Sequence, residues 1–337
     1  MIKKVFILIF FLIAVTLLAY ILQPVKTGKG NDTTQYELVK NWPALPRELL
    51  LGNPTGIDLD TNENIVVFHR ANRKWPLLGP MPSETIKTKT ILIIDRNTGK
   101  LLNSWGDSLF IMPHGLAVDK ENNIWVTDVG LHQVFKFSHE GQLLMKLGEA
   151  KVSGNDSSHF NKPTDVAVAR DGFFYVSDGY GNNRVIKFSS TGRYLFQWGK
   201  KGNGEGEFDL PHGICLNEKG NVYVADRENN RIQQFDSNGN FIKQITDPSF
   251  GNICAVSLNK TKLYAVDDFS FLKLKHRGSD VFIFNTGGDI QTRFGRSGNY
   301  KGNTCWYHDL AIDTEENIYT CDILGNTLQK FSKVPEH

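Results

Sequence analysis

The sequence has 337 residues, a length that suits either two ordinary domains or one large repeat domain. Its 38 lysines and arginines nearly balance its 36 aspartates and glutamates, which excludes the strongly basic surface of nucleic-acid-binding domains. The 31 glycines and 22 phenylalanines favour many short strands joined by tight turns over a disordered chain. We therefore expect an ordered, β-rich protein with no nucleic-acid partner.

The N-terminal segment predicts export. Lys3 and Lys4 precede an uncharged, mainly apolar run over residues 5–22. This run approaches the about 20 residues that cross a bilayer and exceeds the apolar region of an ordinary cleaved signal peptide. We expect residues 1–22 to be an uncleaved signal anchor and residues 23–36 a polar tether, with the remainder extracytoplasmic and membrane-anchored. Secretion after cleavage of the signal is the alternative.

A unit of four strands repeats along the chain after this segment. The clearest copy runs from His114 to Gly148, with strands separated by turns of the Asp-Gly or Asn-Gly type. The six copies start at Thr55, His114, Thr164, His212, Cys254 and His308. Six units of about 40–50 residues predict an all-β, six-bladed β-propeller as the single domain over residues 37–337.

The sixth unit lacks a fourth strand. Complete units end in an outer strand such as residues 102–106, whereas the sixth ends at Phe331, close to the end of the sequence. A strand of the missing kind, Leu38–Trp42, precedes the first unit. We expect it to complete the last blade, because this pairing closes the ring and covers exposed strand edges.

Histidine occupies the first position of units two, four and six. In a propeller the first strand of each blade is innermost, so His114, His212 and His308 should meet around the axis. Three histidines with an open fourth position are typical of a catalytic zinc site, although imidazole also suits iron, copper and nickel. The pattern therefore predicts an axial metal.

Four cysteines complete the candidate metal-ligating or redox residues: Cys215, Cys254, Cys305 and Cys321. None of them forms a CxxC pair. An exported protein could oxidise them, but spacing does not reveal connectivity, and buried free thiols are the simpler expectation.

Several longer motifs resemble one enzyme family. They include NIVVFHR at residues 64–70, DGYGNNR at 178–184 and ADRENNRIQ at 225–233, together with the three axial histidines. Over residues 50–333 the chain resembles the peptidyl-α-hydroxyglycine α-amidating lyases, which are six-bladed propellers of NHL-like repeats. The resemblance implies zinc-dependent cleavage of a peptidyl- or N-acyl-α-hydroxyglycine into an amide and glyoxylate.

The resemblance also implies roles for individual residues. It assigns the zinc ligands to the three histidines already found, and the catalytic base to Tyr180. It assigns two essential arginines to Arg70 and Arg227. Because a tyrosine normally titrates near ~10, we expect Arg70 to lower its pKa. Arg227 would hold the substrate carboxylate or stabilise developing charge, and the two arginines could exchange roles.

A structural calcium site is implied as well. Its ligands would be the backbone carbonyls of Ile57 and Leu116 and the carboxylate of Asp309, which is the hard oxygen chemistry that calcium prefers. The family's two disulfides are absent, because their four positions hold Asn161, Gly181, Tyr223 and Gln234. Since a disulfide contributes about 2–4 kcal/mol, we expect compensating contacts elsewhere.

Two other functions remain open at this level. The chain could be a non-catalytic NHL-type propeller that displays a binding surface around a structural axial metal. It could also be a metal-dependent propeller hydrolase, although such enzymes typically hold calcium through carboxylates rather than imidazoles. We expect a monomer that acts on a small peptide or N-acyl hydroxyglycine and contacts the membrane only through its N-terminal segment.

Overall fold

The computed structural model describes residues 36–76, 79–260, 262–268, 270–271, 275–276, 278–285, 287–295 and 304–334. The predicted anchor over residues 5–22 lies outside this part of the chain, as does the predicted tether apart from Tyr36. Within the described ranges, no helix has the length and apolar character needed to cross a membrane.

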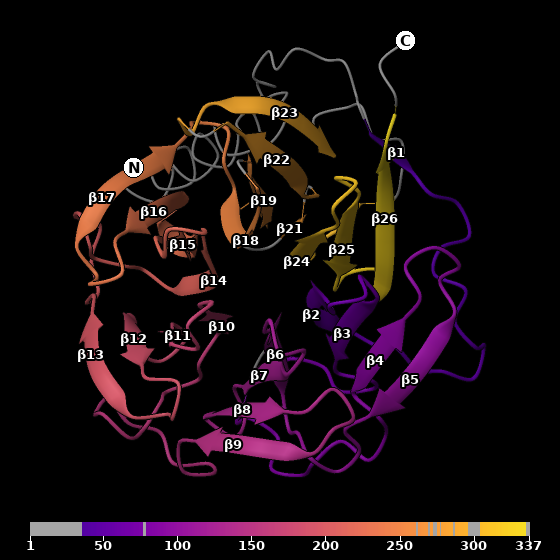
Figure 1. Cartoon of the computed structure of the whole chain (residues 1–337), viewed down its shortest axis with the longest axis horizontal. Helices are drawn as coiled ribbons and strands as arrows, with labels where there is room; N and C mark the ends of the chain where they lie inside the picture. The colour runs from indigo at the N-terminus through magenta and orange to yellow at the C-terminus, as the bar shows by residue number, and fades with distance from the viewer. Residues whose placement is uncertain are drawn as a thin grey trace, which may run out of the picture.

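The described residues form six four-stranded antiparallel sheets arranged in a ring, which confirms the predicted six-bladed propeller (Figure 1). Blade 1 contains β2 (Pro54–Leu59), β3 (Ile65–His69), β4 (Ile91–Ile94) and β5 (Leu101–Trp105). Blade 2 contains β6 (Pro113–Val118), β7 (Ile124–Asp128), β8 (Gln133–Phe137) and β9 (Leu143–Leu147). Blade 3 contains β10 (Asp165–Val168), β11 (Phe174–Asp178), β12 (Arg184–Phe188) and β13 (Tyr194–Trp198).

The remaining three blades follow the same order. Blade 4 contains β14 (Pro211–Leu216), β15 (Val222–Asp226), the short 3-10 helix η1 (Arg227–Asn229), β16 (Arg231–Phe235) and β17 (Phe241–Thr246). Blade 5 contains β18 (Asn252–Asn259), β19 (Lys262–Asp268), β22 (Asp280–Phe284) and β23 (Ile290–Gly295), with a small hairpin of β20 (Ser270–Phe271) and β21 (Lys275–His276). Blade 6 contains β24 (Tyr307–Ile312), β25 (Ile318–Asp322), β26 (Thr327–Lys333) and β1 (Tyr36–Leu38).

The hydrophobic core lies between the blades rather than at one centre. Each of six buried apolar clusters joins two neighbouring blades. For example, the ring of Trp125 on β7 packs 4.6 Å from that of Phe174 on β11, centroid to centroid. Glycine lets the innermost strands of neighbouring blades lie close to each other. A Cβ on Gly115 would lie only 2.6 Å from the carbonyl oxygen of Thr164. This packing brings the starts of the innermost strands together at the axis.

An N-terminal strand completes blade 6, as the sequence suggested, but its bounds differ from those expected. The pairing strand is β1, in which Tyr36 lies opposite Lys333 and Leu38 opposite Phe331. It does not continue to Trp42 as predicted, because the chain turns at Asn41, which has a φ of 61°. Trp42 is instead inserted between blades 6 and 1, where its ring lies 5.3 Å from that of Tyr319.

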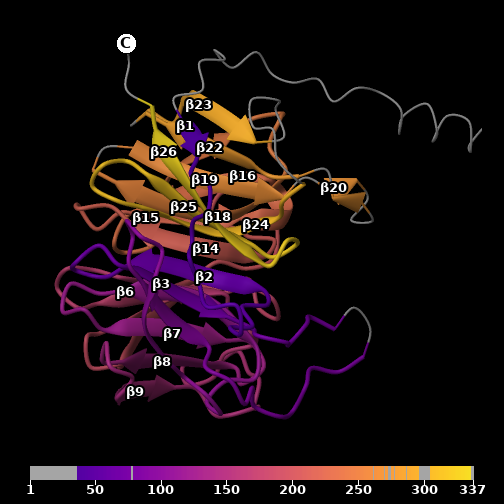
Figure 2. The ribbon, with the colours of Figure 1, turned by 90° about the vertical axis from the view of Figure 1, so that its right-hand side faces the viewer.

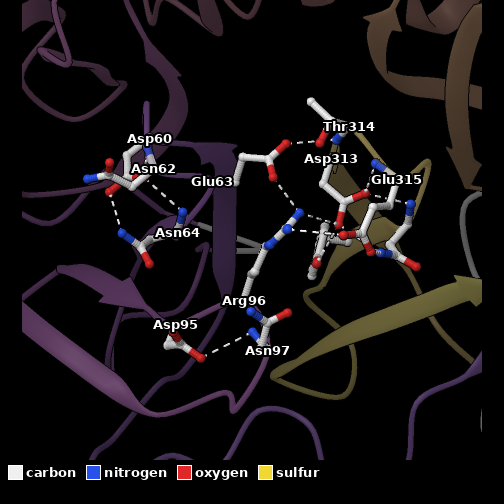
Figure 3. Close-up of polar contacts among 12 residues, drawn as sticks. Asp60, Asn62, Glu63, Asn64, Asp95, Arg96, Asn97, Asp313, Thr314 and Glu315 are labelled. Atoms are coloured by element: carbon white, nitrogen blue, oxygen red, sulfur yellow. Dashed lines mark hydrogen bonds and ion pairs between the residues drawn. The ribbon is translucent and has the colours of Figure 1, made fainter.

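A charged cluster holds blades 1 and 6 together at this closure (Figure 3). Arg96, in the turn after β4, lies 2.5 Å from the carboxylate of Glu63 and 3.4 Å from that of Asp313. It also contacts Glu315 at 3.2 Å. The carbonyl oxygen of Arg96 accepts a hydrogen bond from the indole of Trp42 at 3.1 Å. Arg96 therefore links blade 1 to blade 6, where the first and last described segments of the chain meet.

One side of the ring carries the longest connections. Figure 2 shows the chain between β3 and β4 extending from the same side of the ring as β20. This connection begins at Arg70, directly after β3, and ends at Thr90. It is fixed to the ring near its end, because the N–H of Ile86 donates to the carbonyl of Phe110 at 2.7 Å.

Candidate metal centre and active site

The three predicted metal ligands meet at the axis. The ring centroids of His114, His212 and His308 lie 4.6–4.9 Å apart, and one ligand atom from each lies within 4.8 Å of the others. All three residues are buried. Blades 2, 4 and 6 each contribute one histidine near the start of the innermost strand, as the alternate-blade pattern predicted.

Hydrogen bonds to the next blade fix the orientation of each imidazole. The Nδ1 of His114 lies 2.6 Å from the carbonyl oxygen of Thr164, and His212 makes the same contact with Cys254. His308 contacts the carbonyl of Thr55 at 2.7 Å. Because a carbonyl can only accept, each Nδ1 carries the proton and each neutral ring keeps a lone pair on Nε2. Such hydrogen bonds are typical of histidines that bind metals.

Burial keeps these imidazoles neutral. Burial is the largest cause that lowers the pKa of His114 well below its usual value, followed by the neighbouring His308 and His212. The pKa of His212 is also lowered well below normal, and that of His308 to about 3, again chiefly by burial. Neutral imidazole is the form that binds a metal. Three buried nitrogen donors therefore fit a metal ion.

Tyr180 lies against this triad. It follows β11 in the turn of the DGY motif, and its hydroxyl oxygen is 3.1 Å from Nε2 of His114 and 3.3 Å from Nε2 of His212. Burial raises the pKa of Tyr180, while Arg227 and then Arg70 oppose the rise. Both arginines therefore act on the pKa of Tyr180 in the expected direction, Arg227 more strongly than Arg70, while burial opposes them.

Each of the two arginines has a polar atom that is unpaired among the described residues. Arg70 is 2% exposed, and its Nε donates to the carbonyl of Pro113 at 2.9 Å, but its buried Nη2 has no partner in the described part of the chain. Within the same ranges, the buried Nε of Arg227, at the start of η1, also has no partner. A buried donor without a partner is costly, so these atoms suit a bound acceptor such as a carboxylate.

Sequence reasoning missed Trp75. Its ring lies 4.9 Å from that of Tyr180, and the guanidinium carbon of Arg70 lies 5.3 Å from the same indole. Trp75 belongs to the irregular connection between β3 and β4 rather than to a repeat, so strand periodicity could not place it. Its position five residues after Arg70 was the only available signal.

The predicted calcium ligands also come together. Ile57, Leu116 and Asp309 line one cavity of about 190 Å³, and Asp309 accepts a hydrogen bond from the N–H of Ile57 at 2.9 Å. Asp58 and Asp165, which sequence reasoning missed, line the same cavity. Burial raises the pKa of Asp58 to about 6 and that of Asp165 to about 8. Among the described residues, none of the three carboxylates has an ion-pair partner, which fits a cation there.

The positions of the family's missing disulfides remain in contact. The N–H of Gly181 donates to the carbonyl of Asn161 at 2.9 Å, and a Cβ on Gly181 would lie 2.1 Å from the Asn161 side chain. Tyr223 and Gln234 lie directly opposite each other on β15 and β16. The four cysteines of the chain are free thiols, and three of them are buried as expected, whereas Cys215 is partly exposed. Hydrogen bonding and close packing thus occupy both positions.

Comparisons with known proteins agree with this geometry. The NHL repeat family matches residues 110–137, 160–188 and 208–235. The chain is 33% identical over 315 residues to peptidyl-alpha-hydroxyglycine alpha-amidating lyase 2 of Drosophila melanogaster, covering 86% of this chain and 72% of the relative. It is 43% identical over 234 residues to a Caenorhabditis elegans protein named probable peptidyl-alpha-hydroxyglycine alpha-amidating lyase, covering 64% of each.

Longer relatives match as well. Peptidyl-glycine alpha-amidating monooxygenase B of Xenopus laevis is 37% identical over 325 residues, which cover 90% of this chain but 36% of that protein. The chain spans about a third of the length of such relatives. A streptogramin B lyase structure shares the fold, with a TM-score of 0.58 at 12% identity, covering 88% of this chain and 97% of the other. The sequence relatives show that the chain belongs to the peptidyl-α-hydroxyglycine α-amidating lyase family.

Proposed function

We propose that the protein is a lyase that cleaves peptidyl- or N-acyl-α-hydroxyglycine into the corresponding amide and glyoxylate. The observation that carries this proposal is the position of the Tyr180 hydroxyl, 3.1 and 3.3 Å from the Nε2 atoms of two neutral histidines of the triad. The Tyr180 hydroxyl thus lies beside the histidine triad, near buried arginine donor atoms that have no partner among the described residues. The named relatives support the same reaction.

His114, His212 and His308 would hold zinc, which three imidazoles and an open position suit. When bound, zinc supplies a Lewis acid that makes a nearby hydroxyl more acidic. The protein contributes the geometry of the ligands, because each ring is fixed through Nδ1 by a carbonyl of the next blade.

The arginines and Tyr180 would bind the substrate and transfer its proton. The free donor atoms of Arg70 and Arg227 hold the substrate carboxylate and orient its carbinol carbon. The ionised Tyr180 accepts the carbinol proton, and both arginines favour this ionised form against the effect of burial. As the carbonyl of glyoxylate forms, the C–N bond breaks and Tyr180 returns the proton to the nitrogen to give the amide. Atoms balance without water or an oxidant.

The test is glyoxylate release from α-hydroxyhippurate by the purified protein, with and without a chelator. We expect release that the chelator abolishes and added zinc restores. Tyr180→Phe should lower kcat by about 10²–10⁴-fold, the usual contribution of a general base, while the zinc content stays unchanged. A zinc-loaded protein that releases no glyoxylate would contradict the proposal and favour the non-catalytic binding module.

We propose further that Ile57, Leu116 and Asp309 bind a structural calcium ion. The cavity that these residues share, and the two further carboxylates that line it, support this assignment. Calcium should raise the melting temperature of the wild type, and Asp309→Asn should reduce this effect. Asp171→Asn, in an exposed turn, is the matched control and should respond like the wild type. An unchanged response of Asp309→Asn would refute the site.

For location, we propose a monomer held outside the cytoplasm by residues 5–22. The uncharged run after Lys3 and Lys4 supports this arrangement. We expect the full-length protein in the membrane fraction, accessible to protease from outside, and its native N-terminus to retain residues 1–22. A shorter mature N-terminus in the soluble fraction would show secretion instead.

A further inference from the structure

Trp75 lies beside the site, with its ring against Tyr180. The ring contacts of Tyr180 in the described part of the chain are with His114, His212 and Trp75. The triad histidines and Arg70 are almost fully buried, whereas Trp75 is only partly buried. Part of the Trp75 side chain is therefore exposed in the residue whose ring lies against Tyr180.

Local contacts fix this tryptophan in place. Its ring packs on the apolar cluster between blades 1 and 2 and beside the Arg70 guanidinium, a favourable cation–π arrangement. The N–H of Arg73 donates to the carbonyl of Arg70 at 2.8 Å, and its Nη2 donates to the carbonyl of Glu84 at 2.9 Å. Trp75 is thus held relative to Arg70 by the backbone as well as by its ring.

The structure of the substrate determines which of its groups lies near the Trp75 indole. The carbinol carbon carries a hydroxyl group, a carboxylate and the acyl amide. If the hydroxyl lies at Tyr180 and the triad, and the carboxylate at the free arginine donors, the acyl group must extend toward the partly exposed side of the site. Tyr180, Arg227 and Trp75 are each partly exposed, and Trp75 offers an aromatic ring beside Tyr180.

We propose that Trp75 is a specificity-determining residue that binds the acyl group of the substrate. In a peptide, this group is the residue preceding the hydroxyglycine. The indole selects apolar and aromatic groups at this position, since stacked rings gain free energy beyond their buried area. The inference rests on the proposed lyase function, which supplies the orientation of the substrate.

The experiment compares kcat/KM for N-acetyl-, N-butanoyl- and N-phenylacetyl-α-hydroxyglycine, measured by glyoxylate release. In the wild type, kcat/KM should increase along this series. Trp75→Ala should lower kcat/KM for the phenylacetyl substrate by about tenfold, mainly through KM, and that for the acetyl substrate by less than about threefold. Trp75→Phe should retain most of the preference.

Trp105→Phe is the matched control. Trp105 packs on the same apolar cluster, but it lies on the outer strand β5 and its indole donates to the carbonyl of His139 at 3.1 Å. Trp105→Phe should keep the wild-type ratio of kcat/KM between the phenylacetyl and acetyl substrates.

The outcomes separate this inference from the proposed function. An active wild type with no preference along the acyl series overturns the role of Trp75 and leaves the lyase intact, even if Trp75→Ala does not fold. Equal losses for the acetyl and phenylacetyl substrates in Trp75→Ala also overturn it. A metal-loaded wild type that releases no glyoxylate from any of the three overturns the lyase and the inference together.

Discussion

At the scale of single residues, the chemistry of the site depends on bonds to neighbouring blades. His114 has its proton on Nδ1 because Thr164 of blade 3 supplies a carbonyl there. The same rule applies to His212 and His308 with blades 5 and 1. Blades 2, 4 and 6 thus provide the histidine ligands, and blades 1, 3 and 5 provide the carbonyl groups that orient them.

His69 should make the fold sensitive to acid. Burial lowers the pKa of His69 to about 4, whereas an unfolded histidine titrates near 6.5. The unfolded chain therefore binds more protons in this window, so the free energy of unfolding is highest above pH 6.5 and falls as the pH drops toward 4. The contribution of this residue is about 3 kcal/mol across the window.

Urea titrations of the wild type and His69→Gln at pH 7.5 and pH 4.5 measure this effect. The variant should lose less stability between the two pH values than the wild type does. Equal losses would mean that His69 is not the source of the pH dependence.

At the scale of elements, the closure of the ring is the feature that holds a propeller together. Blade 6 takes three strands from the end of the described chain and one from its beginning. Side chains reinforce the closure, since Arg96 of blade 1 binds Asp313 and Glu315 of blade 6 (Figure 3). These contacts matter because unpaired strand edges expose backbone groups.

Arg96→Ala should lower the free energy of unfolding by about 1–2 kcal/mol, because the buried carboxylate of Asp313 loses its cation. Arg170→Ala is the matched control, since Arg170 and Glu218 also join neighbouring blades but are both mostly exposed. Its effect should stay within about 0.5 kcal/mol. Urea denaturation distinguishes the two, and similar effects would remove the special role of the Arg96 cluster.

Tyr36→Ala tests the observed position of β1. Tyr36 is 6% exposed and stacks on Phe294, with 5.4 Å between ring centroids, so its truncation should cost about 3 kcal/mol. Leu38→Ala, in the same strand, should cost less than about 1 kcal/mol because Leu38 is 36% exposed. The melting temperatures of the two variants should differ accordingly. The reverse order would favour the strand Leu38–Trp42.

At the scale of the whole molecule, one axial metal would connect three blades at once. Each ligand comes from a different blade, and the blades pack through separate apolar clusters. A bound ion therefore stabilises the ring as a unit, because it binds only when the three innermost strands are correctly placed.

Chelation should lower the melting temperature by roughly 5–10 °C if the ion is present at about 1,000 times its dissociation constant. Zinc should restore the original value. His212→Ala should melt at the same temperature with and without the chelator, since one of three ligands is lost. Differential scanning fluorimetry provides the measurement, and a metal-dependent shift that persists in this variant would contradict the triad.

The sequence alone determined the six blades and the three axial histidines. Both follow from periodicity, because equivalent positions of a repeat occupy equivalent places in the ring. His114, His212 and His308 could therefore be placed without coordinates. Residues such as Tyr180 and Arg227 lie in turns, where the repeat gives no position, and resemblance to a family was needed to select them.

Only the tertiary structure decided the features that depend on contacts between irregular segments or different blades. Trp75 reaches Tyr180 through a connection with no periodicity, and Asp58 and Asp165 meet Asp309 through the packing of blades 1, 3 and 6. The direction in which the pKa of Tyr180 shifts could also be found only from the structure, because burial raises this pKa while Arg227 and Arg70 lower it. Local sequence carries the period of the strands, whereas burial and contact across the axis exist only in the closed ring.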